Sequence, residues 1–398
     1  MEKLKILLVS HNHITNYAGA GKVYYELKEK YEAAGYFVDK VDITDLYPQP
    51  QRLFGRIFGR FFTQKIFEYL KENAHNYHII DANLTNITKS KESFGFKGLL
   101  IARSQGIMPL YERSYQIKRF AETSEFTRKK KPIRNFLGKY IRKIFKDFTL
   151  KDFHASVKYA DVIHCLNRSE FDYFLEIGIS KDKLVLIPNG LSKSHLNKFE
   201  QTSYNRKNNS KIVSIIGAWH NVKGSKDWND IAVKLIEDKE FDSILILGTV
   251  MSEEFVKKDF QSNIYPYLNI IPRYDPSNLP NLLETVKVAV SSSYMEGLPY
   301  AVLEQLAAGI PVVGYNVPGV YDFLIQIDKT LLITPGNITE LVKKINEILN
   351  FSNEDYEKLS KKCIEVSKRY VLENIYPVFL NLYEKEYSNI NSKKYYEN

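Results

Sequence analysis

The stretch of sequence best suited to chemistry runs from Ser291 to Gly319 and reads SSSYMEGLPYAVLEQLAAGIPVVGYNVPG. Its pattern predicts a strand that ends near Ser291, then a loop, then a helix whose first residue is Pro299, where the missing N–H of a proline costs nothing. The helix is expected to run through Ala308 and to end at Gly309, since glycine favours the left-handed cap. The amides of its first turn then face the crevice beyond the carboxyl end of a parallel sheet, which suits a diphosphate.

Two carboxylates lie beside this predicted anion site, Glu296 in the loop and Glu304 eight residues later in the helix. Because carboxylates repel phosphate, they are better suited to accept hydrogen bonds from sugar hydroxyls, as an acidic residue does with ribose in dinucleotide-binding folds. The alternative interpretation is an ordinary surface glutamate and a glutamate in a capping loop. Either residue alone would favour that alternative.

The elements that must position these residues recur along both halves of the chain. Short β-rich apolar runs occupy residues 4–10, 36–41, 78–81, 99–103, 162–166 and 184–188, and then 211–217, 243–248, 268–272, 286–291, 311–314 and 330–333. Stretches with helical spacing separate them, which predicts βαβ units and parallel sheets covered on both faces. With 398 residues, 44% of them hydrophobic, the chain can fill two cores of nearly equal size. The polar stretch 198–210 marks the predicted boundary.

Composition excludes several classes of protein. Two cysteines, Cys165 and Cys363, can build neither a disulfide framework nor a cysteine-rich zinc site, which favours a reducing compartment. The apolar run near Met1 is too short for a signal peptide, and no run of 18 apolar residues occurs, so neither secretion nor a membrane span is expected. The sequence contains no Asp-x-Asp triplet, and His11 and His13 have no carboxylate or cysteine cluster nearby, so no metal site is expected.

Positive charge is concentrated in one region. The segment from Arg113 to Lys146 carries 12 Lys/Arg and two acidic residues, whereas the whole chain has a net charge of +9. A second segment, Arg52–Phe62, reads RLFGRIFGRFF and places an apolar stripe edged by arginines on a helix. The segments Arg52–Phe62 and Arg113–Phe148 both fit amphipathic helices on an anionic membrane. The alternative is a helix that covers a core while its arginines extend to solvent. No motif for nucleic-acid binding accompanies the charge.

The pattern Glu-x7-Glu formed by Glu296 and Glu304 resembles the signature of family-4 retaining glycosyltransferases with the GT-B fold. Further stretches are similar to that family in the same order: Ala18–Gly21, Leu184–Gly190 (LVLIPNG), Ile216–Gly224 (IGAWHNVKG) and Tyr370–Tyr383. The resemblance implies two Rossmann-like, doubly wound α/β domains facing a central cleft. Residues 1–198, with insertions at about 52–62 and 113–148, would bind the acceptor, residues 199–369 the nucleotide sugar, and residues 370–398 would cross back over the first domain.

The resemblance also implies roles for individual residues. Glu304 would accept hydrogen bonds from the donor ribose, Glu296 would contact the transferred sugar, and Lys223 would neutralise the diphosphate. The implied catalytic residues are Glu296, Lys223 and Gln105. The implied donor-binding residues are Gly19, Gly21, Gly217, Lys223, Arg273, Tyr274, Gly297, Leu298, Pro299, Tyr300, Ala301 and Glu304.

The sequence departs from the family pattern at two places. Ala218 and Trp219 stand where many relatives have an arginine, and Gln105 stands where relatives often have a histidine. Since glutamine cannot titrate, a proton-transfer role at position 105 is excluded. The implied function is a metal-independent, cofactor-free retaining transfer of a sugar to an acceptor hydroxyl, in surface polysaccharide, lipopolysaccharide or glycolipid synthesis. The enzyme would be cytoplasmic or peripheral on the inner face of the membrane. The alternatives are a catalytically degenerate relative that binds nucleotide sugar or membrane, and a nucleotide-sugar epimerase of the same architecture.

Overall fold

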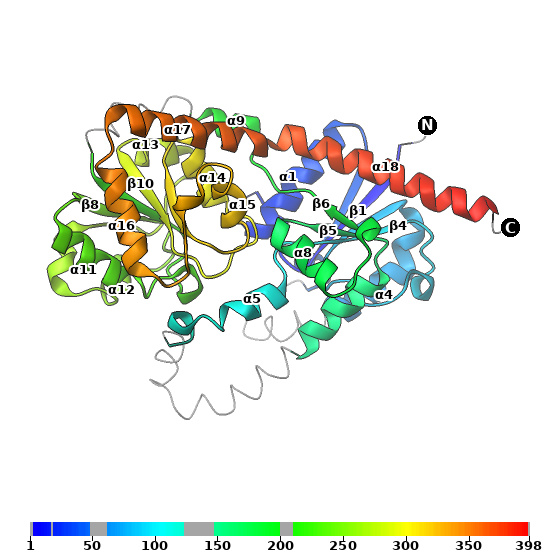
Figure 1. The fold of residues 1–398 in the computed structure, drawn as a ribbon. Coiled ribbons are helices and arrows are strands. Elements are labelled where there is room, and N and C mark those ends of the chain that lie inside the picture. Colours follow the sequence, from blue (N-terminus) through cyan, green and yellow to red (C-terminus); the bar gives the residue numbers. More distant parts are fainter. Residues whose placement is uncertain (1–2, 17–18, 48–61, 123–146, 200–209, 397–398) are drawn as a thin grey trace. The chain divides into compact units, whose positions relative to one another are not determined.

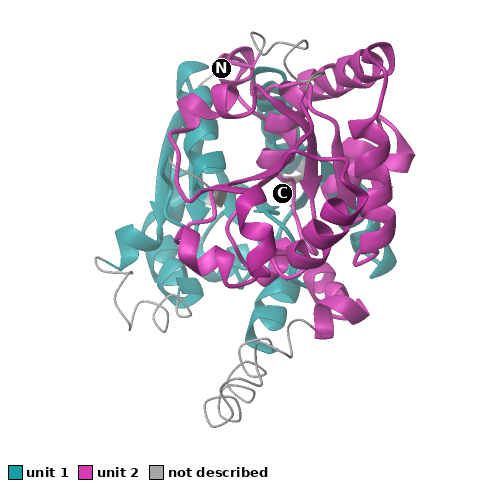
Figure 2. Cartoon of the chain, turned by 90° about the vertical axis from the view of Figure 1, so that its left-hand side faces the viewer, with its two compact units in different colours: residues 1–108, 133–189, 373–398 teal, residues 109–132, 190–372 magenta. Residues whose placement is uncertain are grey.

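The computed structural model of this chain describes residues 3–16, 19–47, 62–122, 147–199 and 210–396. The chain folds into two compact units, shown in different colours in Figure 2. The first contains residues 1–108, 133–189 and 373–398, and the second contains residues 109–132 and 190–372. Each unit has a six-stranded parallel sheet with helices on both sides (Figure 1). The predicted α/β class with two doubly wound parallel sheets is therefore confirmed.

The sheet of the first unit has the strand order β2-β1-β3-β4-β5-β6. Its strands are β1 (Lys5–Ser10), β2 (Phe37–Asp42), β3 (Ile79–Asn83), β4 (Leu99–Arg103), β5 (Val162–Cys165) and β6 (Leu184–Leu186). Its helices include α1 (Gly19–Ala33), α2 (Ile43–Leu46), α4 (Phe62–Asn73), α8 (Arg168–Glu176) and α18 (Leu372–Tyr396). Strands β3 and β4 are buried along their whole length because helices cover both faces of the sheet.

The sheet of the second unit has the order β12-β11-β10-β7-β8-β9, which is the strand order of the Rossmann fold. Its strands are β7 (Ile212–Ile216), β8 (Ser243–Leu247), β9 (Leu268–Ile271), β10 (Val286–Ser291), β11 (Val312–Tyr315) and β12 (Leu332–Ile333). Its helices include α5 (Met108–Ser114), α9 (Lys193–Asn197), α11 (Trp228–Asp238), α12 (Glu253–Lys257), α13 (Leu279–Leu282), α14 (Tyr300–Ala307), α15 (Val320–Leu324), α16 (Ile338–Leu349) and α17 (Asn353–Ser367). The strand order reverses between β7 and β10, where ligands bind in such sheets.

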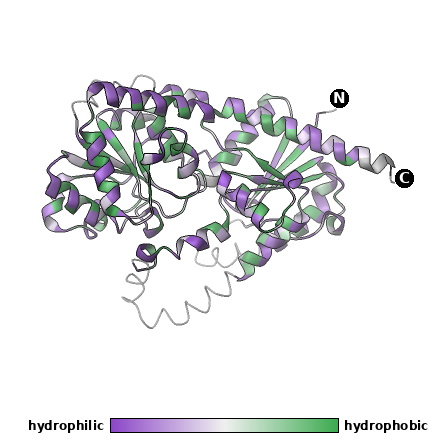
Figure 3. Ribbon diagram, viewed as in Figure 1, coloured by the Kyte–Doolittle hydropathy of each residue, from purple (hydrophilic) through white to green (hydrophobic). Residues whose placement is uncertain are grey.

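Hydrophobic residues gather on the strands and on the inner faces of the helices, as the hydropathy colours in Figure 3 show. Helix α16 is an example, since Leu341, Val342, Ile345 and Leu349 are buried while Lys343 is exposed. Among the residues that the structure describes, no helix is both long and apolar enough to cross a bilayer.

The units are assembled from segments that alternate along the chain. Residues 109–122 precede β5 of the first unit but pack with the second, whereas the sequence analysis counted residues 113–122 in an insertion of the first domain. Residues 109–122 pack with the second unit because three of their side chains contact it, those of Ser114, Arg119 and Phe120. The rest of that insertion through position 146, and the segment 52–61, lie outside the described residues.

Candidate functional site

The candidate site of the second unit lies where β7 and β10 end, at the point of reversal in the strand order. Strand β7 is followed by Gly217, whose φ of 152° favours glycine, and no atom lies within 4 Å of the place where a Cβ would stand. Gly217 therefore leaves open space beside the end of the strand. Trp219, which with Ala218 stands where the resemblance implies an arginine, is 4% exposed, and its indole N–H donates to Asp259 at 2.9 Å. Its ring thus belongs to the core and supplies no cation.

The loop that follows β7 is fastened to the loop that follows β10. Gly224 has a φ of 74°, and a Cβ there would overlap with the carbonyl oxygen of Ser292. The Ser292 hydroxyl donates to the carbonyl of Lys223 at 3.0 Å and accepts from the Trp228 indole at 3.0 Å. These contacts bring together two loops that are about 70 positions apart in the sequence.

Lys223 and Glu296 form an ion pair at this junction, with 2.5 Å between Nζ and Oε1. The lysine side chain is 37% exposed and the glutamate side chain 11% exposed. Because the pair is open to solvent on the lysine side, an anionic ligand can compete for the ammonium group. The ammonium and the carboxylate are then available to phosphate and sugar groups of one ligand.

Helix α14 begins at Tyr300 and not at Pro299, as the sequence analysis had expected. Pro299 is the N-cap because its ψ of 110° is extended, while its φ of −75° would suit either position. Gly297, Tyr300 and Ala301 are partly exposed, whereas Leu298 and Pro299 are buried. Gly309 follows the helix with a left-handed φ of 69°, as predicted. The helix amide dipoles thus start beside Glu296, which suits an anion.

Glu304 lies on α14, and its carboxylate is held by a residue that sequence reasoning missed. Nε2 of His195, on α9, lies 2.9 Å from Oε1 of Glu304, and both side chains are only 11–13% exposed. No sequence pattern pointed to His195, since it is 109 positions away. The imidazole fixes the direction of the carboxylate.

Arg273 and Tyr274 follow β9, the edge strand of this sheet, at the same carboxyl end. Arg273 is exposed, and the ring of Tyr274 packs beside Gly248, where an added Cβ would lie 3.3 Å from Cε1. Burial and the nearby charge of Glu304 raise the pKa of Tyr274, so its hydroxyl stays protonated. Tyr274 therefore lies on the Glu304 side of the site.

The candidate residues of the first unit lie in the loops after β1, β3 and β4. Nδ2 of Asn12 lies 3.4 Å from Oε1 of Gln105, and the amide of His11 donates to Asn86 at 3.1 Å. Gly19 is the first residue of α1. A Cβ on Gly21 would overlap with the carbonyl oxygen of His13, so Gly21 lets α1 approach this loop closely. Sequence reasoning missed Asn86.

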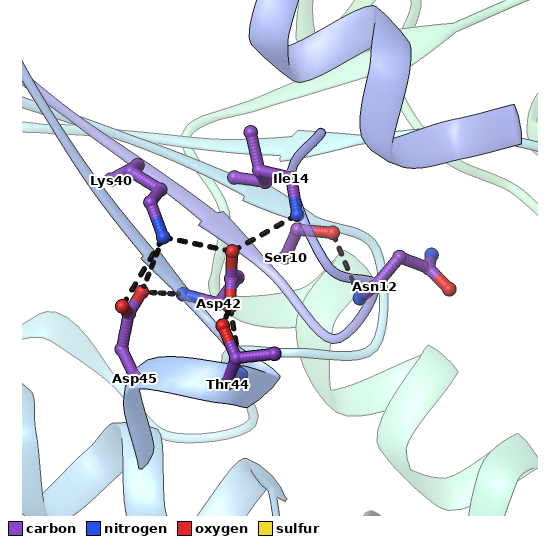
Figure 4. A network of polar contacts seen from close by, with 7 residues as sticks. All are labelled: Ser10, Asn12, Ile14, Lys40, Asp42, Thr44 and Asp45. Atoms are coloured by element: carbon purple, nitrogen blue, oxygen red, sulfur yellow. Dashed lines mark hydrogen bonds and ion pairs between the residues drawn. The ribbon is translucent and has the colours of Figure 1, made fainter. Parts of the chain in front are cut away.

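Asp42 holds the same loop from the neighbouring strand β2 (Figure 4). Its buried carboxylate accepts from the amide of Ile14 at 3.0 Å, from the amide of Thr44 at 2.7 Å and from Lys40 Nζ at 2.9 Å. Burial by itself raises the pKa of Asp42, but the hydrogen bond from the Thr44 hydroxyl, together with these three, lowers it below its usual value. The carboxylate stays charged and anchors the loop after β1.

Among the described residues, no cluster of three or more His, Cys, Asp or Glu side chains could hold a metal ion. The polar groups at the candidate site of the second unit are instead a lysine, a histidine, helix amides and two carboxylates. This set can bind an anion and sugar hydroxyls together.

Residues 197–368 match the family model described as glycosyl transferases group 1. An uncharacterized glycosyltransferase of Haemophilus influenzae is 27% identical over 202 residues, which are 50% of this chain and 50% of that protein. The UDP-Gal:alpha-D-GlcNAc-diphosphoundecaprenol alpha-1,3-galactosyltransferase of Escherichia coli is 24% identical over 166 residues, 39% of this chain and 42% of that protein. The matches thus span about half the length of these curated relatives.

The solved structures that resemble this chain share its fold. Sucrose-phosphate synthase from Thermosynechococcus elongatus superposes with a TM-score of 0.74 at 18% identity, covering 97% of this chain and 100% of that one. The Anabaena protein HepE in complex with UDP gives 0.62 at 14% identity, covering 96% and 100%. At these identities the likeness establishes the two-unit α/β fold. The family model, which includes Lys223, Glu296 and Glu304, and the curated relatives support a relation of this chain to the glycosyltransferases.

Proposed function

We propose that this protein transfers a sugar from a nucleotide-diphosphate donor to an acceptor hydroxyl, with retention of anomeric configuration and without a metal ion. The observation that carries the proposal is the Lys223–Glu296 pair at the reversal point of the second sheet, beside the start of α14 and within the region that matches the family model. A cation and a carboxylate at that point suit a diphosphate and a sugar in one ligand.

Different residues of the second unit would bind the different parts of the donor. The ribose hydroxyls would donate to Glu304, whose carboxylate His195 orients. The diphosphate would bind the ammonium group of Lys223 in place of Glu296, and it would accept hydrogen bonds from the first amides of α14. Glu296 would then be available to accept hydrogen bonds from the sugar. Because negative charge grows on the leaving diphosphate, a fixed cation and helix amides stabilise the transition state more than the bound donor.

We propose that the first unit supplies acceptor contacts through the loops after β1 and β4, where Asn12 and Gln105 offer neutral donors and acceptors. These side chains can orient a hydroxyl, and neither titrates. The name of the Escherichia coli relative includes a diphosphoundecaprenol-linked sugar as its acceptor, which supports a lipid-linked glycan as the acceptor here.

Incubation with UDP-, GDP-, ADP- and CMP-linked sugars, after exhaustive treatment with EDTA, tests the reaction. We expect nucleotide release from one donor, faster in the presence of an acceptor, and a product whose anomeric proton coupling by NMR matches that of the donor. Loss of activity with EDTA that Mg²⁺ restores would contradict the metal-independent mechanism. Conversion of the donor into an epimer without transfer would favour an epimerase, and binding without turnover would favour a degenerate relative.

We also propose that the enzyme works at the cytoplasmic face of an anionic membrane, which residues 52–61 and the charge of Arg113–Phe148 would contact. Phe148 is 59% exposed, which supports this, whereas Arg119 and Phe120 are engaged by the second unit and would not take part. Phe62, the last residue of the predicted amphipathic segment, is 2% exposed and packs in the core of the first unit, so it would not take part either. Changing Arg52, Arg56 and Arg60 to Gln is expected to weaken co-sedimentation with anionic vesicles. Changing the exposed Lys65, Arg168 and Lys361 to Gln removes the same charge as a control. Equal losses in the two triple variants would contradict a specific membrane contact.

A further inference from the structure

The described segment 109–122 comes from the first half of the sequence but packs with the second unit. It contains most of α5, which ends at Ser114, and a short helical stretch at residues 118–122. Two of its buried side chains, Ser114 and Phe120, contact Tyr294, which lies between the end of β10 and Glu296.

Tyr294 connects the two charged groups of the donor site. Its amide donates to the carbonyl of Val222 at 2.8 Å, directly before Lys223 in the sequence, and it precedes Glu296 by two positions. Its ring is 1% exposed, and its hydroxyl donates to Asp227 at 2.6 Å. Together with the Ser292 contacts described above, Tyr294 therefore sets how the Lys223 loop and the Glu296 loop lie against each other.

Two residues of the segment touch Tyr294 directly. The hydroxyl of Ser114 donates to the carbonyl oxygen of Tyr294 at 2.7 Å, and both residues are buried. The ring of Phe120 stacks on the Tyr294 ring with 4.8 Å between centroids. The backbone of Tyr294 is thus bonded on one side by the Lys223 loop and on the other by the segment.

Arg119 holds Tyr294 through a buried carboxylate. Its Nε donates to Oδ1 of Asp227 at 2.6 Å, and its guanidinium also reaches Asp230 at 2.7 Å. The other oxygen of Asp227 accepts from the hydroxyls of Tyr294 and Tyr315, at 2.6 and 2.7 Å. Asp227 is 1% exposed, so without the cation a buried charge would depend on neutral donors alone.

We propose that residues 109–122 are a positioning element of the donor site, in which Ser114 and Arg119 hold Tyr294 and thereby fix the geometry of Lys223 and Glu296. This inference rests on the proposed function of that site. Ser114 and Arg119 are positioning residues, because every contact that carries the argument passes through Tyr294 or Asp227.

The end of the site that would bind the nucleoside is held by residues outside the segment 109–122. Glu304 is oriented by His195 on α9, and none of the segment contacts described above reaches either residue. Loss of the segment contacts should therefore impair catalysis more than binding of the nucleoside at Glu304. A displacement of reacting groups by about 1 Å can lower a rate about 100-fold.

The test compares Arg119→Gln and Ser114→Ala with Lys118→Gln, whose side chain is 90% exposed in the same segment. We expect kcat for nucleotide release to fall about 10–100-fold for Arg119→Gln and about 3–10-fold for Ser114→Ala. The Kd of the nucleoside monophosphate, which lacks the diphosphate that Lys223 would bind, should stay within about threefold, and the control should match the parent. The double variant of Arg119→Gln with Tyr294→Phe should lose no more than the worse single variant, because the two residues act through the same carboxylate.

Hydrogen–deuterium exchange in the ligand-free protein gives a second readout that needs no activity. In Arg119→Gln, exchange should rise at residues 292–299 and 220–226, while α9 and α14 stay protected. Unchanged exchange at these loops would overturn the positioning role even if no donor is ever turned over. An equal loss of nucleoside monophosphate affinity and kcat, or exchange raised throughout the second unit, would instead indicate a general structural role and would also overturn it. A parent that neither binds nor turns over any nucleotide sugar would contradict the proposed function, and the exchange data would still decide the positioning role.

Discussion

Each unit holds an acid–base pair of side chains near the carboxyl ends of its central strands, and the two pairs differ in their access to solvent. In the first unit, Arg103 at the end of β4 binds Asp81 of β3 with both side chains at most 1% exposed. In the second unit, Lys223 is 37% exposed and Glu296 is 11% exposed. The ion pair is thus buried in the first unit (the enclosed pair) and accessible to solvent in the second (the open pair).

The surroundings of the two pairs explain what each can do. Tyr383 of α18 donates to Asp81, and the Arg103 guanidinium lies over the ring of Phe379 with 4.1 Å to its centroid. These contacts tie α18 to the sheet and keep the pair out of contact with solvent. The Lys223–Glu296 pair leaves a cation at the surface, where a ligand can recruit it. An enclosed pair is a structural feature, and an open pair at a reversal of strand order is a candidate site.

The largest expected effect is on stability and comes from the enclosed pair. Arg103→Met leaves the Asp81 carboxylate buried without its cation, which is expected to lower the free energy of unfolding by about 3–5 kcal/mol. Urea denaturation followed by circular dichroism measures it. Arg103→Met combined with Asp81→Leu removes both charges and should recover much of the loss. A loss below about 1 kcal/mol in the single variant would mean that the enclosed pair is not what stabilises this unit.

The open pair is expected to behave in the opposite way. Glu296→Gln removes the carboxylate charge and keeps the shape, so the turnover of donor should fall about 100–1000-fold, as for other transition-state contacts. The free energy of unfolding should change by less than about 0.5 kcal/mol, since Gln keeps the shape and water can solvate Lys223, which is 37% exposed. Both tryptophans of the chain, Trp219 and Trp228, lie in the second unit, so their fluorescence follows its unfolding. A Glu296→Gln variant that is destabilised but fully active would mean that the open pair stabilises the fold and takes no part in the reaction.

His164 of β5 extends the comparison to pH. Burial, helped by the charge of Arg103, lowers its pKa to about 3, and its Nε2 donates to the Ile187 carbonyl at 2.6 Å. Because the unfolded chain binds a proton near pH 6.5 and the folded chain does not, stability should fall as the pH drops from 6.5 toward 3. Between pH 7 and pH 5 we expect a loss on the order of 1–2 kcal/mol. His164→Gln should flatten this slope, and an unchanged slope would assign the pH effect to other groups.

The smallest effect is expected at His195, which orients Glu304. His195→Ala should weaken nucleotide binding by about 0.5–1.5 kcal/mol, the range for one hydrogen bond, with kcat nearly unchanged. Isothermal titration calorimetry with the nucleotide measures it, and Lys193→Ala, on the same short helix, is the control. If His195→Ala instead lowers kcat without affecting affinity, His195 belongs with the reacting groups and not with the ribose end.

Much of the fold was predictable because its strands are apolar runs of regular spacing. The predicted run 99–103 coincides with β4, and 286–291 coincides with β10. The turn at Gly309 was also predicted, since a left-handed residue must follow the helix there. Each end of α14 lies one residue inside the predicted range, since Pro299 is the N-cap and Ala308 the C-cap. The fixed φ of Pro299 suits both an N-cap and a first helical residue, so the sequence could not distinguish them.

The contacts that complete the site could not be predicted. His195 and Glu304 are 109 positions apart, and Arg119 and Asp227 are 108 apart, so only the folded chain brings them together. Arg119 stood out in the sequence only as part of a basic segment, and charge alone does not tell an arginine that pairs inside the protein from one that meets a membrane. Similarly, nothing in the sequence distinguished the enclosed Arg103 from an exposed arginine at the end of a strand.

The most direct test of the account is thermal unfolding with saturating UDP, GDP, ADP and CMP, on the parent protein, on Glu304→Ala and on the exposed-residue control Glu357→Ala. A ligand at 100 times its Kd stabilises the folded state by about 2.7 kcal/mol, which amounts to a shift of several degrees. The account predicts a shift with one of the nucleotides in the parent and in Glu357→Ala that is strongly reduced in Glu304→Ala. A shift of equal size in all three proteins, or no shift with any nucleotide, would contradict the assignment of a nucleotide-binding site to the second unit around Glu304.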